Sequence, residues 1–139
     1  MGNALWLILA LPEWFFPSVL MPFAAGPLTL IPALGTVCLA IGIGLGVMKH
    51  KPALWLFLIP ALFCEALVGI AGLFRGELRG SASEWALVAF LIFQLALCGY
   101  LVWRVRGART AAVPLALFSL TYAMYAAFIA SMAFSDSWM

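Results

Sequence analysis

Long apolar runs separated by short polar connectors dominate the sequence. A membrane-spanning helix needs about 20 predominantly apolar residues, with a range of about 17–25. Four runs meet this length, at residues 27–48, 53–74, 85–103 and 111–134. None of them shows the strict alternation of a membrane strand, and a sheet exposed to lipid would have to close into a barrel. The pattern therefore predicts an all-α integral membrane protein with four transmembrane helices.

The connectors between these runs cover residues 49–52, 75–84 and 104–110. Short connections place consecutive helices side by side and in opposite directions. We therefore expect an antiparallel four-helix bundle, and we expect residues 1–139 to form a single transmembrane domain.

The first 26 residues are apolar but interrupted by Pro12, Glu13, Pro17 and Pro22. A proline inside a helix removes one backbone hydrogen bond and clashes with the preceding turn. In lipid, the freed carbonyl groups need other partners. We therefore expect residues 1–26 to form a broken segment that is interfacial or re-entrant, and a kinked fifth span is the alternative. The expected interfacial anchors are its aromatic residues Trp6, Trp14, Phe15 and Phe16.

Composition points to the same environment. Hydrophobic residues make up 67% of the chain and charged residues 9%, against about 45–50% and about 25% in soluble domains. A chain of 139 residues has too little interior to hide so much apolar surface from water. The lipid bilayer is therefore the expected solvent of most of the surface.

Basic residues gather in the first and third connectors. Five of the seven Lys and Arg residues lie there: Lys49, Lys51, Arg104, Arg106 and Arg109. The positive-inside rule assigns both connectors, 49–52 and 104–110, to the cytoplasm and the C-terminus to the outside. This orientation suits a bacterial inner membrane. The chain has no basic patch interleaved with aromatic residues, so we expect no nucleic-acid partner.

The cysteines Cys38, Cys64 and Cys98 all lie within apolar runs, where a free cysteine behaves as a small buried hydrophobe. Their spacing matches no local zinc-binding or redox motif. We therefore expect neither a metal site nor a cofactor.

Glycines mark the helix faces that a neighbour can approach closely. Gly35, Gly42 and Gly46 form one stripe in the first span, and Gly69 and Gly72 share a face with Glu65 in the second. Small residues of this kind line helix interfaces in membranes. The stripes predict helix packing, either within one subunit or against a second copy of the chain.

Each span also carries a hydrogen-bonding residue close to its centre. We predict that these residues form one cluster at the midplane of the bilayer: Thr36, Glu65, Gln94, Ser119 and Tyr122. Burial disfavours the charged form of a carboxyl group, and no span holds a base that would offset this. We therefore expect Glu65 to be protonated at neutral pH and to donate to Gln94 or to a backbone carbonyl.

An acid inside the membrane is by default a candidate for function. The favoured hypothesis is a small oligomeric protein that moves a small solute or ion and uses Glu65 as its protonatable group. One alternative is a non-catalytic accessory subunit, anchor or immunity-type protein that binds a larger membrane protein through helix contacts. An intramembrane enzyme that uses Glu65 as general acid on a lipophilic substrate is less favoured, because Ser119 has no histidine base and Glu65 no second catalytic group. Glu65 could also serve only to fix helix register.

Overall fold

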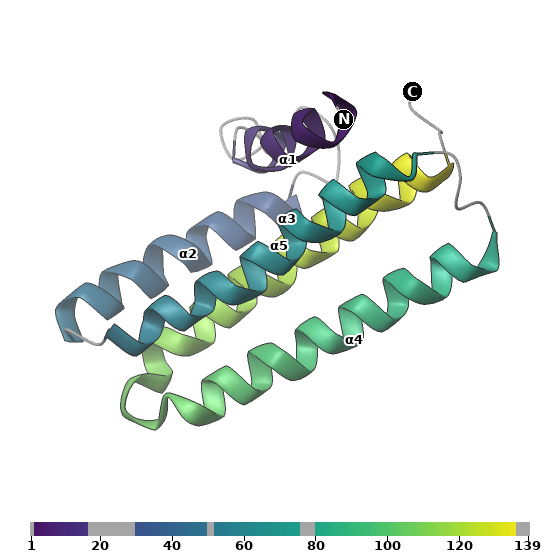
Figure 1. Cartoon of the computed structure of the whole chain (residues 1–139). Helices are drawn as coiled ribbons and strands as arrows, with labels where there is room; N and C mark the ends of the chain where they lie inside the picture. Colours follow the sequence, from purple (N-terminus) through teal and green to yellow (C-terminus); the bar gives the residue numbers. More distant parts are fainter. Residues whose placement is uncertain (1, 17–29, 50–51, 76–79, 136–139) are drawn as a thin grey trace.

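The computed structural model describes residues 2–16, 30–49, 52–75 and 80–135. Within these ranges the chain is helical, and no strand is present. The helices are α1 (Gly2–Phe15), α2 (Leu30–Lys49), the 3-10 helix η3 (Pro52–Phe57), α3 (Leu58–Leu73), α4 (Ser81–Arg104), the 3-10 helix η4 (Arg106–Ala108) and α5 (Arg109–Ser135) (Figure 1).

Four helical stretches in the described ranges are long and apolar enough to cross a membrane. They are Leu30–Met48, Leu54–Leu73, Ser81–Arg104 and Arg106–Ser135. This confirms the prediction of an all-helical chain with four apolar segments of spanning length. The predicted start of the first span, residues 27–29, lies outside the described residues.

The second span has nearly the predicted bounds but a 3-10 start, whereas the third and fourth spans begin earlier than predicted, the fourth at Arg106 rather than at residue 111. The second span begins as the 3-10 helix η3 and becomes α-helical only at Leu58. Pro60 accounts for this, because it has no N–H to offer the carbonyl four residues earlier and its ring crowds that turn. The third span begins at Ser81, one turn before the predicted position. Gly80 precedes it with a φ of 120°, a left-handed conformation that only glycine adopts easily.

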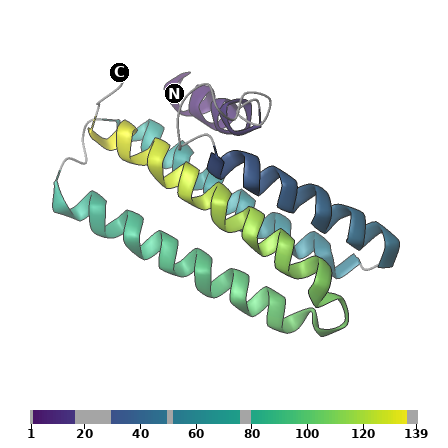
Figure 2. The ribbon, with the colours of Figure 1, turned by 180° about the vertical axis from the view of Figure 1, so that it is seen from behind.

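Helix α5 is the centre of the bundle. Helices α2, α3 and α4 all pack against it, and consecutive spans run in opposite directions (Figures 1 and 2). The buried positions of α5 are mostly alanine, which lets the neighbouring backbones come close. Large apolar side chains on the outer faces of the other helices stay exposed, as a lipid solvent requires.

Helices α2 and α3 are joined by a short connector but pack mainly against α5, on different sides of it. The two sides of the resulting gap therefore come from α2 and α3, and its floor comes from α5. This gap contains the site described below.

Helix α1 lies across the bundle and packs chiefly against α3 (Figure 1). Its 14 residues extend about 21 Å, which is shorter than the roughly 30 Å hydrocarbon core. The predicted break at Pro12 does not occur, because α1 continues through Pro12 to Phe15. The rest of the predicted broken segment, residues 17–26, lies outside the described residues.

The aromatic residues of α1 do not all act as the predicted anchors. Phe15 is fully buried in the bundle, which contradicts its assignment to the membrane interface. Trp6 and Phe16 keep 57% and 39% of their surface exposed, so an interfacial position stays open to them. The side chain of Trp14 lies outside the described part of the chain.

Candidate functional site

The centre of the candidate site is a contact between α3 and α5. Tyr122 of α5 donates its phenolic hydrogen to Oε1 of Glu65 on α3. The other carboxyl oxygen of Glu65, Oε2, is buried and has no hydrogen-bond partner among the described residues. Glu65 therefore faces protein, and only one of its two carboxyl oxygens has a hydrogen-bond partner among the described residues.

Gln94 lies at a second contact, between α4 and α3. Its side chain is completely buried. Nε2 donates to the Pro60 carbonyl oxygen at 3.1 Å and lies 3.8 Å from the Sγ atom of Cys64. The Oε1 atom is buried without a partner within the described ranges. Gln94 thus joins α4 to α3, but through backbone and sulfur rather than through Glu65.

The predicted bond between Glu65 and Gln94 is therefore replaced by two separate contacts. The reason is helix geometry, because successive residues of a helix point about 100° apart. Cys64 faces α4 and meets Gln94, whereas Glu65 faces α5 and meets Tyr122.

Thr36 and Ser119 do not join either contact through a hydrogen bond to its members. The Oγ1 atom of Thr36 donates to the Pro32 carbonyl oxygen at 3.0 Å, and Oγ of Ser119 donates to the Leu115 carbonyl oxygen at 2.9 Å. Each hydroxyl is thus satisfied four residues back in its own helix, as serine and threonine commonly are. Of the five residues predicted to cluster, only Glu65 and Tyr122 bond to each other.

Phe15 is a neighbour of this site that sequence analysis missed. Its ring lies edge-on to those of Phe118, Tyr122 and Tyr125, with centroid distances of 6.0, 5.0 and 5.6 Å. Phe118 and Tyr122 stack on each other at 5.6 Å. Helix α1 therefore places the Phe15 ring in contact with Tyr122, the residue that donates a hydrogen bond to Glu65.

The sequence did contain a signal for the burial of Phe15. Leu7, Leu11 and Phe15 recur every four residues and so share one helix face. All three are buried in the structure. The prolines nearby led to the expectation of a broken segment and masked this periodicity.

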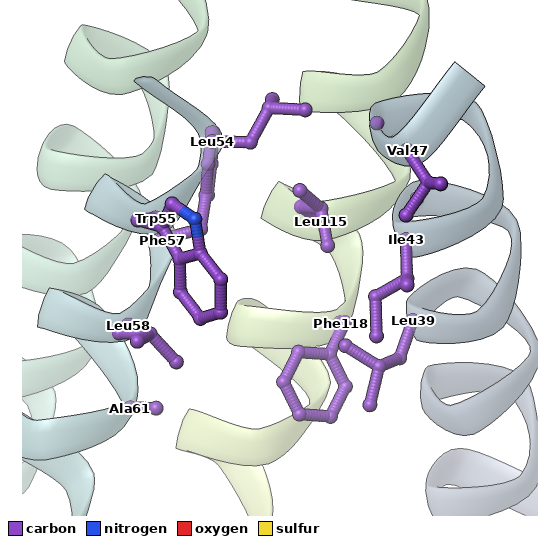
Figure 3. Close-up of a pocket in the computed structure, with 12 residues that line it drawn as sticks. Leu39, Ile43, Val47, Leu54, Trp55, Phe57, Leu58, Ala61, Leu115 and Phe118 are labelled. Carbon is purple, nitrogen blue, oxygen red and sulfur yellow. The ribbon is translucent and has the colours of Figure 1, made fainter. Parts of the chain in front are cut away.

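A groove of about 550 Å³ lies between α2 and the segment that contains η3 and the start of α3, with α5 as its floor (Figure 3). Every residue that lines it is apolar. These residues are Leu39, Gly42, Ile43, Gly46 and Val47 of α2, Leu54, Trp55 and Phe57 of η3, Leu58 and Ala61 of α3, and Leu115 and Phe118 of α5. Side chains from both walls point into the space above α5 (Figure 3).

The predicted packing glycines lie at contacts within the chain. A Cβ atom added to Gly42 would lie 2.6 Å from Cγ of Leu115, and one added to Gly46 would lie 2.6 Å from Cδ1 of Leu54. At Gly35 the added atom would meet the Phe15 ring at 2.9 Å.

On α3, Gly69 faces Cδ1 of Ile8 at 2.9 Å, and Gly72 is buried. Gly42 thus lets α2 approach α5, Gly46 lets it approach η3, and Gly69 lets α1 approach α3.

The site offers one carboxyl group, one phenol and one carboxamide inside an apolar bundle. Among the described residues, no three His, Cys, Asp or Glu side chains converge as metal ligands would. The arrangement is suited to binding and releasing a proton or to pairing with a single polar group. No family model, curated protein or solved structure is similar enough to this chain to indicate a function.

Proposed function

We propose that the protein moves a small solute or ion across a membrane, and that Glu65 binds and releases a proton during transport. The observation that supports this most directly is the state of the Glu65 carboxyl group. One of its oxygens accepts a hydrogen bond from Tyr122, and the other is buried without a partner in the described part of the chain.

A buried carboxylate oxygen without a partner is costly, by several kcal/mol for a charged group. A proton on Oε2 removes the charge, and a bound cation compensates it. Glu65 therefore has two favourable states, protonated or cation-paired, and exchange between them couples one species to the other. Tyr122 holds the carboxyl group in place in both states.

The membrane orientation belongs to the same proposal. The positive-inside rule places the connectors 49–52 and 104–110 in the cytoplasm of a bacterial cell and the C-terminus outside. Helix α1 is too short to span alone and would enter from the outer side, where it packs against α3 and reaches the middle of α5 through Phe15. Because four helices enclose little space, the transporting unit would be an oligomer. Gly44 of α2 has no atom within 4 Å of an added Cβ and offers a face for a second copy.

Infrared difference spectroscopy tests the proton-binding role without knowledge of the solute. The purified protein in lipid would be compared at low and high pH, and the carbonyl band of a protonated carboxyl group would be followed. Glu65→Gln should remove one component of this band. The control Glu84→Gln changes an exposed acid in the first turn of α4, so the Glu65 component should persist.

Unchanged spectra for Glu65→Gln would reject proton binding at this residue. Purification in mild detergent addresses the principal alternative. A stoichiometric larger protein that copurifies with the chain, together with an unchanged Glu65→Gln spectrum, would favour an accessory subunit.

A further inference from the structure

The gap between α2 and α3 is filled in one part and open in another. Where α2 contributes Gly35 and α5 contributes Tyr122, the ring of Phe15 occupies the space. Two turns further along α2, from Gly42 to Gly46, nothing from the described chain fills it, and this is the groove of about 550 Å³ (Figure 3). Phe15 therefore lies beyond the inner end of the groove.

The inner end of the groove leads to the Glu65–Tyr122 pair. Ala61 lines the groove and lies four residues before Glu65 on α3. Phe118 also lines it and lies four residues before Tyr122 on α5. Residues four apart share a helix face, about one turn or 5.4 Å apart along the axis. The α3 wall of the groove thus continues onto the Glu65 carboxyl group, and its α5 floor continues onto the Tyr122 phenol.

We propose that this groove binds a lipophilic cation, with the apolar body between α2 and α3 and the positive end at Glu65. The inference rests on the proposed function and names its substrate class. A lining that is almost entirely apolar, apart from the indole N–H of Trp55, gives a hydrated ion or sugar little compensation for lost water. A volume of about 550 Å³ falls within the usual range for pockets that hold one small molecule.

Charge complementarity selects a cation over a neutral or anionic molecule. Away from the helix ends, Glu65 is the only carboxyl group in the four spanning stretches, and their bases Arg104, Arg106 and Arg109 all lie at helix ends. The stacked rings of Phe118 and Tyr122 add faces that attract a positive group. Binding then balances in charge, because the cation takes the place of the proton on Glu65 and this proton leaves to water.

A matched pair of elongated fluorescent probes tests the proposal. Diphenylhexatriene is neutral, and its trimethylammonium derivative differs by one cationic group. Each would be added to the purified protein in neutral detergent with a pH indicator and little buffer. Adducts would be counted by native mass spectrometry. We expect saturable binding of the cation with release of protons, and at least about tenfold weaker binding of the neutral probe without release.

Variants locate the binding site. Ala61→Phe fills the inner end of the groove and should abolish both the adduct and proton release. Ile43→Trp fills the wall on α2, where the half-exposed residue leaves room for folding, and should have the same effect. Ile92→Phe is the control, because Ile92 is 63% exposed on α4 and does not line the groove. Glu65→Gln should end proton release and weaken cation binding at least about tenfold.

Cation binding that persists in both folded groove variants would overturn the proposal, as would equal binding of the two probes. Absence of cation binding, combined with a Glu65 component in the infrared band, would reject the substrate class and leave proton binding intact. Loss of that infrared component as well would reject the proposed function itself.

Discussion

At the residue scale, Glu65 and Tyr122 depend on each other. Removing the phenolic hydroxyl leaves both oxygens of the Glu65 carboxyl group without a described partner. We expect Tyr122→Phe to destabilise the protein by about 1–3 kcal/mol, the usual penalty for orphaning a buried polar group. Replacing both partners by apolar residues avoids this penalty. The double variant Glu65→Leu/Tyr122→Phe should therefore be more stable than Tyr122→Phe alone.

Thermal unfolding in one detergent would measure this difference. A double variant that is less stable than Tyr122→Phe would contradict the interpretation, since it would mean that Glu65 has a further favourable partner. Thr36→Val is a suitable control, because the Thr36 hydroxyl bonds only to the Pro32 carbonyl oxygen of its own helix among the described contacts. Its effect should not depend on whether Tyr122 is present.

At the scale of helices, α1 is held by a buried face that includes Leu7, Leu11 and Phe15. Phe15 is its most deeply inserted side chain, packed among rings of α5. Phe15→Ala should cost about 3–5 kcal/mol by leaving a cavity and should loosen α1 from the bundle. Phe16→Ala is the matched control, because Phe16 keeps 39% of its surface exposed and should change stability much less.

Thermal unfolding and protease sensitivity of α1 would measure both variants. Equal stability losses for Phe15→Ala and Phe16→Ala would show that α1 is held mainly by lipid. An increase in protease cleavage confined to Phe15→Ala would support its role as the side chain that secures α1.

The helices were predictable to different degrees. The four apolar runs predict the spans because a helix of about 20 apolar residues matches the thickness of the hydrocarbon core. Hydropathy placed the second span within one residue of its bounds at each end, but it does not register that Pro60 makes the first turns of this span 3-10 rather than α-helical.

The pairing within the site was predictable only in part. Predicted depth grouped Glu65 with Tyr122, and these two residues do share a hydrogen bond. Depth alone could not show that Gln94 faces Cys64, or that Thr36 and Ser119 are satisfied within their own helices. Those outcomes depend on helix rotation, which the apolar outer faces leave undetermined.

At the scale of the whole molecule, the orientation in the membrane determines which leaflet the groove opens toward. The end of the groove farther from Glu65, called the outer end here, is lined by Val47, Leu54 and Trp55, which are close in sequence to the connector 49–52. Under the proposed function, and with the basic connectors in the cytoplasm, a lipophilic cation would enter from the inner leaflet and meet Glu65 deeper in the membrane. Proton entry from the opposite side would then drive export.

Reporter fusions test this orientation. Alkaline phosphatase fused after Met139 should be active, and green fluorescent protein at the same position should be dark, because the fourth spanning stretch carries Arg106 and Arg109 at its start and would end outside. Fusions within the connector 49–52 should give the reverse pattern. A fluorescent fusion after Met139 would instead place the outer end of the groove in the outer leaflet. The direction of the proposed exchange at Glu65 would then be inverted, although the contacts proposed to bind the proton and the cation would be the same.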